Sequence, residues 1–405
     1  MNNRRLHLSG LMFDGIASGM MLMALPWSIL SEGNNGTFLA AVTLVCTLLS
    51  FMFTPFFATA IDRYSRKHIL AVSQLIQMLS AISVVVVSWF VGVNIWILAS
   101  CLLVFWLASD LAWSTNGAFT QELYKPSEYG RVSSQQEIVM QITTLSAGGM
   151  GVWLLEVWTI DRFAILTSAL TALALLCFMA IRHQTSRKTA NVVRFHQQLG
   201  ESKRIFSQSP LFFLFIALSC LSYPMMTYLS KLVPIYLSEN LVSGEWFAWW
   251  QINYGVGAML CGLAIVKVMK RVRHEKLMLA SMVMMCLLLA IMAMTLSPLS
   301  IVVIALFMGL FNATNRIARV NKLHHDVDNS VRGRVDGGMK LFTTAAQSGS
   351  YILIAYLAHY QLIEVGFAVA ALVMIAATLA MWILKRANVL DHSPIEAELQ
   401  GEGAV

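Results

Sequence analysis

The sequence predicts an all-α polytopic membrane protein with twelve transmembrane helices arranged in two pseudo-symmetric six-helix bundles. Three observations lead to this prediction: only 12% of the 405 residues are charged while 58% are hydrophobic, long apolar runs recur along the chain, and basic residues concentrate in alternate loops. Soluble globular chains carry about 25% charged residues. A soluble enzyme, a single-span receptor and a disordered chain are therefore excluded.

Twelve apolar runs are long enough to cross a bilayer, for which a helix needs about 20 residues. They cover residues 9–30, 38–60, 69–91, 95–118, 137–157, 162–181, 210–236, 246–266, 277–296, 298–318, 340–358 and 362–384. The N-terminus, every second loop and the ends of the runs beside those loops carry 26 of the 28 Lys and Arg residues; the opposite side has only Arg162, and Lys231 lies inside a run. Because basic residues accumulate on the cytoplasmic side, we expect a multi-pass protein of a bacterial inner membrane with both termini in the cytoplasm. The net charge of +7 is then explained by the basic cytoplasmic loops of a membrane protein, and we expect no nucleic-acid partner.

A polar segment divides the runs into two groups of six. We predict an N-terminal bundle at 1–182, a cytoplasmic linker at 183–209, a C-terminal bundle at 210–386 and a cytoplasmic tail at 387–405. Short internal matches indicate a duplication, because G-R-V at 130–132 recurs at 333–335, and L-P with S-E at 25–32 recurs as V-P with S-E at 233–239. Duplicated halves that rock about a site near the membrane midplane are typical of secondary transporters.

The loop between the second and third runs has the sequence A-T-A-I-D-R-Y-S-R-K at residues 58–67. It resembles the G-xxx-D-R-x-G-R-K signature of the major facilitator superfamily, with Ala58 and Ser65 in place of the two glycines. The resemblance implies a cytoplasmic gate in which the acidic residue faces the positive N-terminal end of the eleventh helix. The gating residues implied by this match are Asp62, Arg63, Arg66 and Lys67.

Two further stretches are similar to one branch of exporters in that superfamily, which includes the enterobactin exporter and macrolide efflux pumps. They are L-P-W at 25–27 and V-R-G-R-V at 331–335, and the stretch 312–335 also resembles exporters encoded with siderophore pathways. The resemblance implies a proton-coupled exporter of a small organic molecule, with a siderophore as the favoured substrate and multidrug efflux as the alternative. The chain has no G-xxxx-G-K-S/T motif, so the energy is expected to come from an ion gradient.

Two acidic residues inside the runs are candidates for coupling. Asp14 lies about 9 Å inside the first helix from the cytoplasm, and Asp110 lies about 22 Å down the fourth helix from the outside, so both reach a similar depth. A charge inside a membrane costs several kcal/mol and is a functional candidate by default. By resemblance, the first, fourth, seventh and tenth helices line the central cavity, so the two carboxylates could share one water-filled site.

Polar and aromatic residues of the predicted spans are candidates for substrate binding. The cations suit an anionic substrate, the amides suit a polar wall, and the aromatic rings could stack on a bulky organic ligand. The set comprises Lys231, Arg316, Asn312, Asn315, Gln141, Gln251, Gln347, Trp113, Tyr223, Tyr228, Trp250 and Tyr254. Each also has an ordinary interpretation, since Lys231 can extend to water, asparagines join helices, and rings pack or anchor at the interface.

The internal repeat predicts one more gating contact. Under the 203-residue offset, Glu137 corresponds to Lys340 and Arg131 corresponds to Arg334. Opposite charges at equivalent places could meet when the cytoplasmic ends of the halves close. We therefore expect a Glu137–Lys340 contact that helps to lock the inner side, worth about 0.2–1 kcal/mol.

Functions of another class have weaker support. His324-His325-Asp326-Val327-Asp328 could indicate a metal site or a membrane-embedded enzyme, yet it lies in a predicted cytoplasmic loop without a second ligand cluster. Metal-ion export is disfavoured because the six cysteines are scattered within the runs. We expect no enzyme activity, no cofactor and no bound metal, and a monomer in the lipid bilayer.

Overall fold

The computed structural model describes residues 3–31, 36–90, 92, 94–182, 204–243, 245–329 and 331–386. Within these residues the chain is helical and contains no strand, as predicted. The chain divides into two units, Met1–Leu123 with Val139–Val193, and Tyr124–Ile138 with Arg194–Val405. Most of the predicted linker and the whole predicted tail lie outside the described residues, so the predicted domain boundaries stay a prediction.

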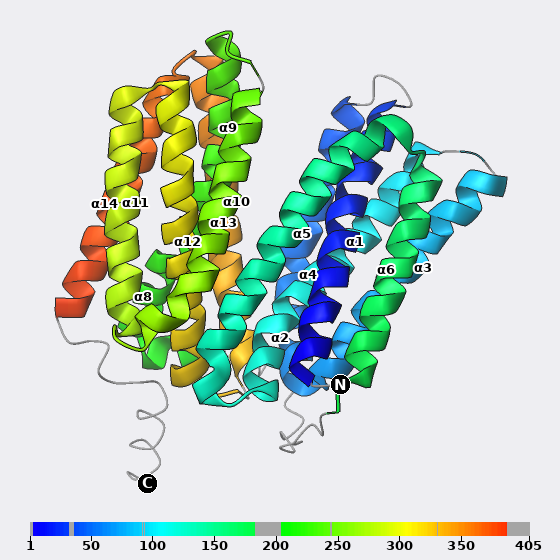
Figure 1. Ribbon diagram of the computed structural model, residues 1–405, viewed down its shortest axis with the longest axis horizontal. Coiled ribbons are helices and arrows are strands. Elements are labelled where there is room, and N and C mark those ends of the chain that lie inside the picture. Colours follow the sequence, from blue (N-terminus) through cyan, green and yellow to red (C-terminus); the bar gives the residue numbers. More distant parts are fainter. Residues whose placement is uncertain are drawn as a thin grey trace. The chain divides into compact units, whose positions relative to one another are not determined.

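In the described residues of unit 1 the chain forms five complete helices and most of a sixth, which Figure 1 shows side by side as a bundle. They are α1 (Asn3–Ser31), α2 (Gly36–Arg63), α3 (Arg66–Phe90), α4 (Ile95–Leu123), α6 (Ile160–Ala180) and the part of α5 (Tyr129–Val157) after residue 138. Helix α1 packs against α4 and α6, α3 packs against the same two helices, and α2 packs against α4. Helix α4 is therefore the centre of this unit.

Unit 2 repeats that arrangement. It contains α8 (Pro210–Cys220), α9 (Ser222–Glu239), α10 (Glu245–Met269), α11 (His274–Thr295), α12 (Pro298–Asp326), α13 (Arg332–His359) and α14 (Ile363–Arg386), with η1 (Pro126–Glu128) and the first ten residues of α5. Helices α8 and α9 pack against α12 and α14, α11 packs against the same two, and α10 packs against α12. These pairs match those of unit 1 under the internal repeat, which confirms the predicted pseudo-symmetry.

Each of the twelve predicted runs coincides with a helix, except that the seventh is split. Helix α8 ends at Cys220 and α9 starts at Ser222. Pro224 has no backbone N–H and cannot donate to the carbonyl of Cys220, so the continuous helix predicted over 210–236 is interrupted here.

Ten segments of the described chain are long and apolar enough to cross a membrane, with α8 and α9 together forming one of them. The repeat-related helices α5 and α13 are 29 and 28 residues long but are not among the ten. Both have charged first turns and are rich in Gln, Ser, Thr and Gly, which lowers their mean hydropathy.

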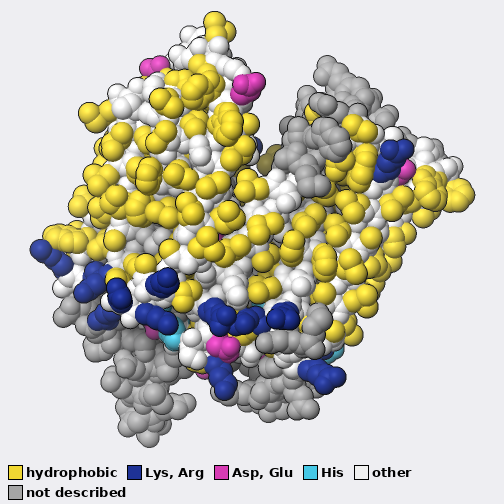
Figure 2. Space-filling model, in the orientation of Figure 1, with side chains coloured by type: hydrophobic (Ala, Val, Ile, Leu, Met, Phe, Trp, Pro, Cys, Tyr) yellow, Lys and Arg dark blue, Asp and Glu magenta, His cyan; other side chains and the backbone are white. Residues whose placement is uncertain are grey.

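Apolar side chains lie both inside the units and on their outer surfaces. Each unit has a buried core, and large residues such as Leu44 and Met52 in unit 1 and Leu263 and Leu372 in unit 2 are exposed. Figure 2 shows hydrophobic side chains over the sides of the helices, and in unit 2 Lys and Arg gather toward the end where α8 begins. This distribution is the one expected for helices surrounded by lipid.

The backbones of α10 and α12 approach closely at two reciprocal glycines. A Cβ atom added to Gly257 would overlap the carbonyl oxygen of Leu306, and one added to Gly309 would overlap the carbonyl oxygen of Tyr254. Small residues let transmembrane helices approach in this way. This contact fixes the two helices that carry the polar residues of unit 2.

Candidate functional site

Asp14 is the centre of a polar cluster inside unit 1. Its Oδ1 accepts hydrogen bonds from Nε2 of Gln74 on α3 at 2.8 Å and from Oγ of Ser18 on α1 at 3.3 Å. Oγ of Ser109 on α4 donates to Oγ of Ser18 at 3.4 Å. Three helices thus contribute to the surroundings of a half-buried carboxylate.

Asp110, the second predicted coupling residue, has a different partner. Its Oδ2 accepts a hydrogen bond from Ser50 on α2. Ser109 hydrogen-bonds to Ser18 of the Asp14 cluster, whereas Asp110 hydrogen-bonds to Ser50 on α2. Two adjacent residues of α4 therefore belong to different polar clusters. Both predicted carboxylates therefore belong to unit 1, but their hydrogen bonds run to α3 and α2, and a shared site for the two stays a prediction.

Arg66 of the predicted gating motif joins three helices within unit 1. Its buried guanidinium lies 3.9 Å from Asp62 at the end of α2 and 3.5 Å from Glu122 at the end of α4, and it donates to the carbonyl of Ala118 at 3.1 Å. Lys67 donates to the carbonyl of Ile181 after α6 at 2.8 Å, whereas Arg63 is exposed. The motif thus has a local structural role, in addition to any role in gating.

In unit 2 an aromatic row leads to the polar part of α12. The rings of Phe247, Trp250 and Tyr254 on α10 are stacked, with centroids 5.7 Å and 6.2 Å apart. The hydroxyl of Tyr254 accepts a hydrogen bond of 2.6 Å from Nδ2 of Asn312. Nε1 of Trp250 is a buried donor without a hydrogen-bond partner among the described residues. The structure therefore brings three predicted residues together, Trp250, Tyr254 and Asn312.

Arg316 lies one turn beyond Asn312 and pairs with Glu137. Its Nη2 is 2.5 Å from both carboxylate oxygens of Glu137. The Glu137 side chain is 3% exposed and that of Arg316 is 23% exposed. Glu137 belongs to the first ten residues of α5, the part of that helix assigned to unit 2. The ion pair therefore holds this segment of α5 against α12.

Asn315 and Arg319 of α12 form hydrogen bonds with residues at the interruption between α8 and α9. Nδ2 of Asn315 donates to the carbonyl of Ser219 at 2.8 Å and to Oγ of Ser222 at 2.9 Å, and Nη1 of Arg319 donates to the same carbonyl at 2.8 Å. These side chains compensate the backbone bonds that the interrupted helix lacks. Asn315, predicted to contact substrate, is fully buried and has this structural role.

The other predicted residues are scattered over the units. Trp113, Tyr223, Lys231, Gln251 and Arg131 are exposed on their helices, Gln141 is buried, and Arg334 and Lys340 are partly buried. Tyr228 donates to the carbonyl of Gly366 at 3.0 Å, and Gln347 donates to the hydroxyl of Tyr351 at 2.6 Å. Their proposed contacts with substrate or gate stay predictions.

Several residues of these clusters were not predicted. Gln74 and Gln77 were missed because the third run was not expected to reach the cavity, although two glutamines three residues apart in an apolar run are a visible signal. Gly257 and Gly309 could have been found from the small residues spaced along the eighth and tenth runs. Arg319 looked like a loop cation because the tenth run was ended at residue 318.

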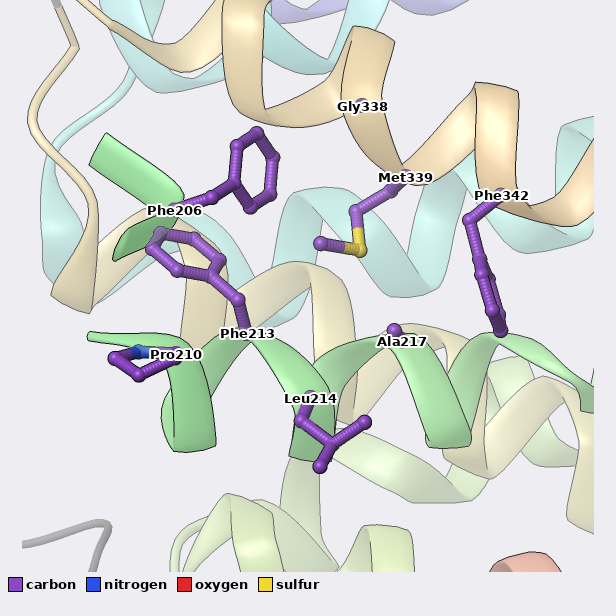
Figure 3. A pocket seen from close by; sticks show the side chains of 8 residues that line it. All are labelled: Phe206, Pro210, Phe213, Leu214, Ala217, Gly338, Met339 and Phe342. Carbon is purple, nitrogen blue, oxygen red and sulfur yellow. The ribbon is translucent and has the colours of Figure 1, made fainter. Parts of the chain in front are cut away.

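An apolar pocket of about 450 Å³ lies at the start of α8 in unit 2 (Figure 3). It is lined by Phe206, Pro210, Phe213, Leu214, Ala217, Gly338, Met339 and Phe342. None of the predicted site residues lines it. Among the described residues, no group of three or more His, Cys, Asp or Glu side chains is placed to hold a metal ion.

Comparisons with known proteins give one family match and several solved structures of similar fold. The family described as Major Facilitator Superfamily matches residues 8–241. No curated protein matches the chain. Among solved structures, a bacterial homologue of the iron transporter ferroportin in the outward-facing state is similar, with a TM-score of 0.77 and 14% identity over 95% of this chain and 100% of that one.

Two further solved structures have the same fold. The human organic anion transporter MFSD10 (TETRAN) has a TM-score of 0.72 and 12% identity, over 93% of this chain and 98% of the other. FucP, a transporter solved in the outward conformation, has a TM-score of 0.71 and 12% identity, over 94% of this chain and 98% of its own. At these identities the likeness concerns the fold alone.

Proposed function

Because the chain belongs to the Major Facilitator Superfamily and is a transporter, not an enzyme, we propose that it exports a small anionic organic molecule, with a siderophore as the favoured substrate. The observation that carries this proposal is the partly exposed guanidinium of Arg316, which lies on α12 next to Asn312 and the aromatic row of α10. A cation beside stacked rings suits an anionic ligand with an aromatic or otherwise flat part.

The driving force is proposed to be an ion gradient, with the proton as the coupling ion. Asp14 and Asp110 support this assignment, since they are intramembrane carboxylates of unit 1 that accept hydrogen bonds from Gln74 and Ser18 and from Ser50, respectively. Such residues commonly mark ion pathways in transporters. The protein is proposed to act as a monomer in the inner membrane, with the two halves alternating around the substrate site.

Deletion of the gene in its host tests the proposed substrate. We expect the siderophore to accumulate inside the cells and to fall in the medium, as measured by mass spectrometry of both fractions, and we expect a plasmid copy to restore secretion. An Arg316→Gln copy that reaches the membrane should fail to do so. Unchanged siderophore secretion together with increased drug sensitivity would contradict the proposal and favour multidrug efflux.

Through the ion pair between Arg316 and Glu137, substrate binding can change how the start of α5 is held against α12. An anionic substrate that binds Arg316 competes with Glu137 for the same guanidinium. Once Glu137 is released, the first ten residues of α5 lose their ion pair with α12. We propose that this exchange links substrate binding to the opening of the cytoplasmic gate.

Charge-reversal variants distinguish the ion pair of Glu137 with Arg316 from its predicted contact with Lys340. Glu137→Arg and Arg316→Glu should each lower stability by about 3–5 kcal/mol, because each replaces a largely buried ion pair with two like charges. The double variant should recover most of that thermal stability but not transport, since a carboxylate then replaces the cation on α12. Melting temperatures and vesicle transport measure the two effects.

The contact predicted between Glu137 and Lys340 competes with this ion pair and has its own test. If the two residues meet in one state of the transport cycle, Glu137→Lys combined with Lys340→Glu should recover transport that each single reversal loses.

A Glu137→Arg/Arg316→Glu variant no more stable than its worse parent would contradict the ion pair with Arg316.

A further inference from the structure

Asp14 has no ion-pair partner within the described part of the chain, although it is an acidic residue inside a membrane span. The groups around it are neutral, namely the amide of Gln74 and the hydroxyl of Ser18, with Ser109 behind the hydroxyl. Intramembrane carboxylates usually pair with a cation or line a path for one. The carboxylate therefore lacks compensation for its charge.

Two glutamines of α3 next to this carboxylate have unused oxygens. Gln74 and Gln77 are both fully buried and lie one helical turn apart on the same face of α3. Gln74 uses its Nε2 toward Asp14, while its Oε1 has no hydrogen-bond partner. Gln77 also contacts the carboxylate, and its Oε1 has no hydrogen-bond partner among the described residues. A buried amide oxygen without a partner costs about 1–3 kcal/mol, so two of them beside one carboxylate require an explanation.

A bound cation accounts for these oxygens better than a proton does. A proton on Asp14 can be donated to only one acceptor, which leaves the other glutamine oxygen without a partner. A hard cation contacts several oxygens at once and can be held by the carboxylate together with both amide oxygens. The hydroxyl of Ser18, and that of Ser109 next to it, provide further oxygens. A water molecule could satisfy the amides but would leave the charge of Asp14 uncompensated.

The charge of the cluster favours a monovalent ion. One carboxylate and four neutral oxygen-bearing groups bind Na⁺ with no net charge, whereas a divalent ion would leave a positive charge within the bundle. Asp14 is only half-buried, so an ion can reach its carboxylate, whereas the two glutamines are fully buried.

We infer that Asp14, Gln74 and Gln77 form a binding site for a monovalent metal cation of the Na⁺ class, which occupies the position that the proposed function gives to a proton. Binding of the ion is independent of the transported substrate. Its use to drive transport rests on the proposed function.

Isothermal titration of the purified full chain with NaCl tests the site, with choline chloride as the control for ionic strength. We expect saturable Na⁺ binding to the wild-type protein, no binding to Asp14→Asn, and affinity lowered more than about tenfold in Gln77→Met, a change of about 1.4 kcal/mol. Methionine keeps the length of the side chain and removes its oxygen. Thr167→Val is the matched control, because Thr167 is a fully buried hydroxyl without a partner on α6 of the same unit.

The outcomes separate this site from the proposed function. Absence of saturable Na⁺ binding to the wild-type protein, or equal affinity in Gln77→Met and wild type, would overturn the inference. Na⁺ binding that depends on Asp14 and Gln77 but does not change export in vesicles would support the site and contradict its use in coupling. Size-exclusion profiles and melting curves of each variant show whether a loss of binding comes from misfolding, and Gln77→Met tests the site even if Asp14→Asn does not fold.

Discussion

Asp14→Asn and Asp110→Asn are each expected to lower ion-driven export more than about tenfold while the protein stays folded in the membrane. Asparagine keeps an oxygen that can accept the hydrogen bonds of Gln74 and Ser18 at position 14, and that of Ser50 at position 110. Packing is therefore preserved, and the change removes the charge. Under the proposed coupling, export against a substrate gradient needs that charge, because an ion couples to transport only through a group that binds it.

Vesicles with an imposed ion gradient measure this effect, and substrate exchange without a gradient provides the second measurement. We expect exchange to continue in both variants, since the residues of unit 2 that we propose to bind substrate are unchanged. Asp161→Asn is the control, because Asp161 is an acidic residue in the first turn of α6. Full gradient-driven export by both variants would refute the coupling role of these carboxylates.

The positions of the helices could be predicted from the sequence because lipid imposes a simple rule on each span. A segment that crosses the hydrocarbon region must be apolar for about 20 residues and must satisfy its own backbone. The twelve runs therefore match the helices closely, and the match extends to α5 and α13, whose first turns are charged. The interruption near Leu221 was missed because the run around Pro224 is apolar without a break.

The partners of the site residues could not be predicted, because depth along a helix does not fix the direction in which a side chain points. Asp14 and Asp110 were placed at similar depth, yet they bond to α3 and α2. The repeat predicts a contact of Glu137 with Lys340, which stays a prediction, but it gave no sign of the ion pair that Glu137 forms with Arg316. Rotation of a helix about its axis depends on packing with its neighbours, and a single sequence does not contain that information.

Gly257→Ala and Gly309→Ala are expected to be the most damaging small substitutions in unit 2. The added methyl group would overlap the backbone of the facing helix at both positions, and backbone atoms cannot move aside as a flexible side chain can. Overpacking of this kind costs about 1–3 kcal/mol and sometimes more. The helices must separate to accommodate it, which would also disturb the hydrogen bond between Asn312 and Tyr254.

Gly349→Ala on α13 separates this steric effect from the general effect of alanine in a helix. A Cβ atom at Gly349 meets nothing within 4 Å, so alanine there should be neutral or should stabilise the helix by up to about 1 kcal/mol. Thermal unfolding in detergent should give lower melting temperatures for the α10 and α12 variants than for the wild type, and no decrease for the α13 variant. The double variant Gly257→Ala/Gly309→Ala should lose less thermal stability than the sum of the two single losses. Both methyl groups force apart the same pair of helices, so the second meets helices that the first has already separated. Wild-type stability in both single variants would mean that α10 and α12 are not in backbone contact.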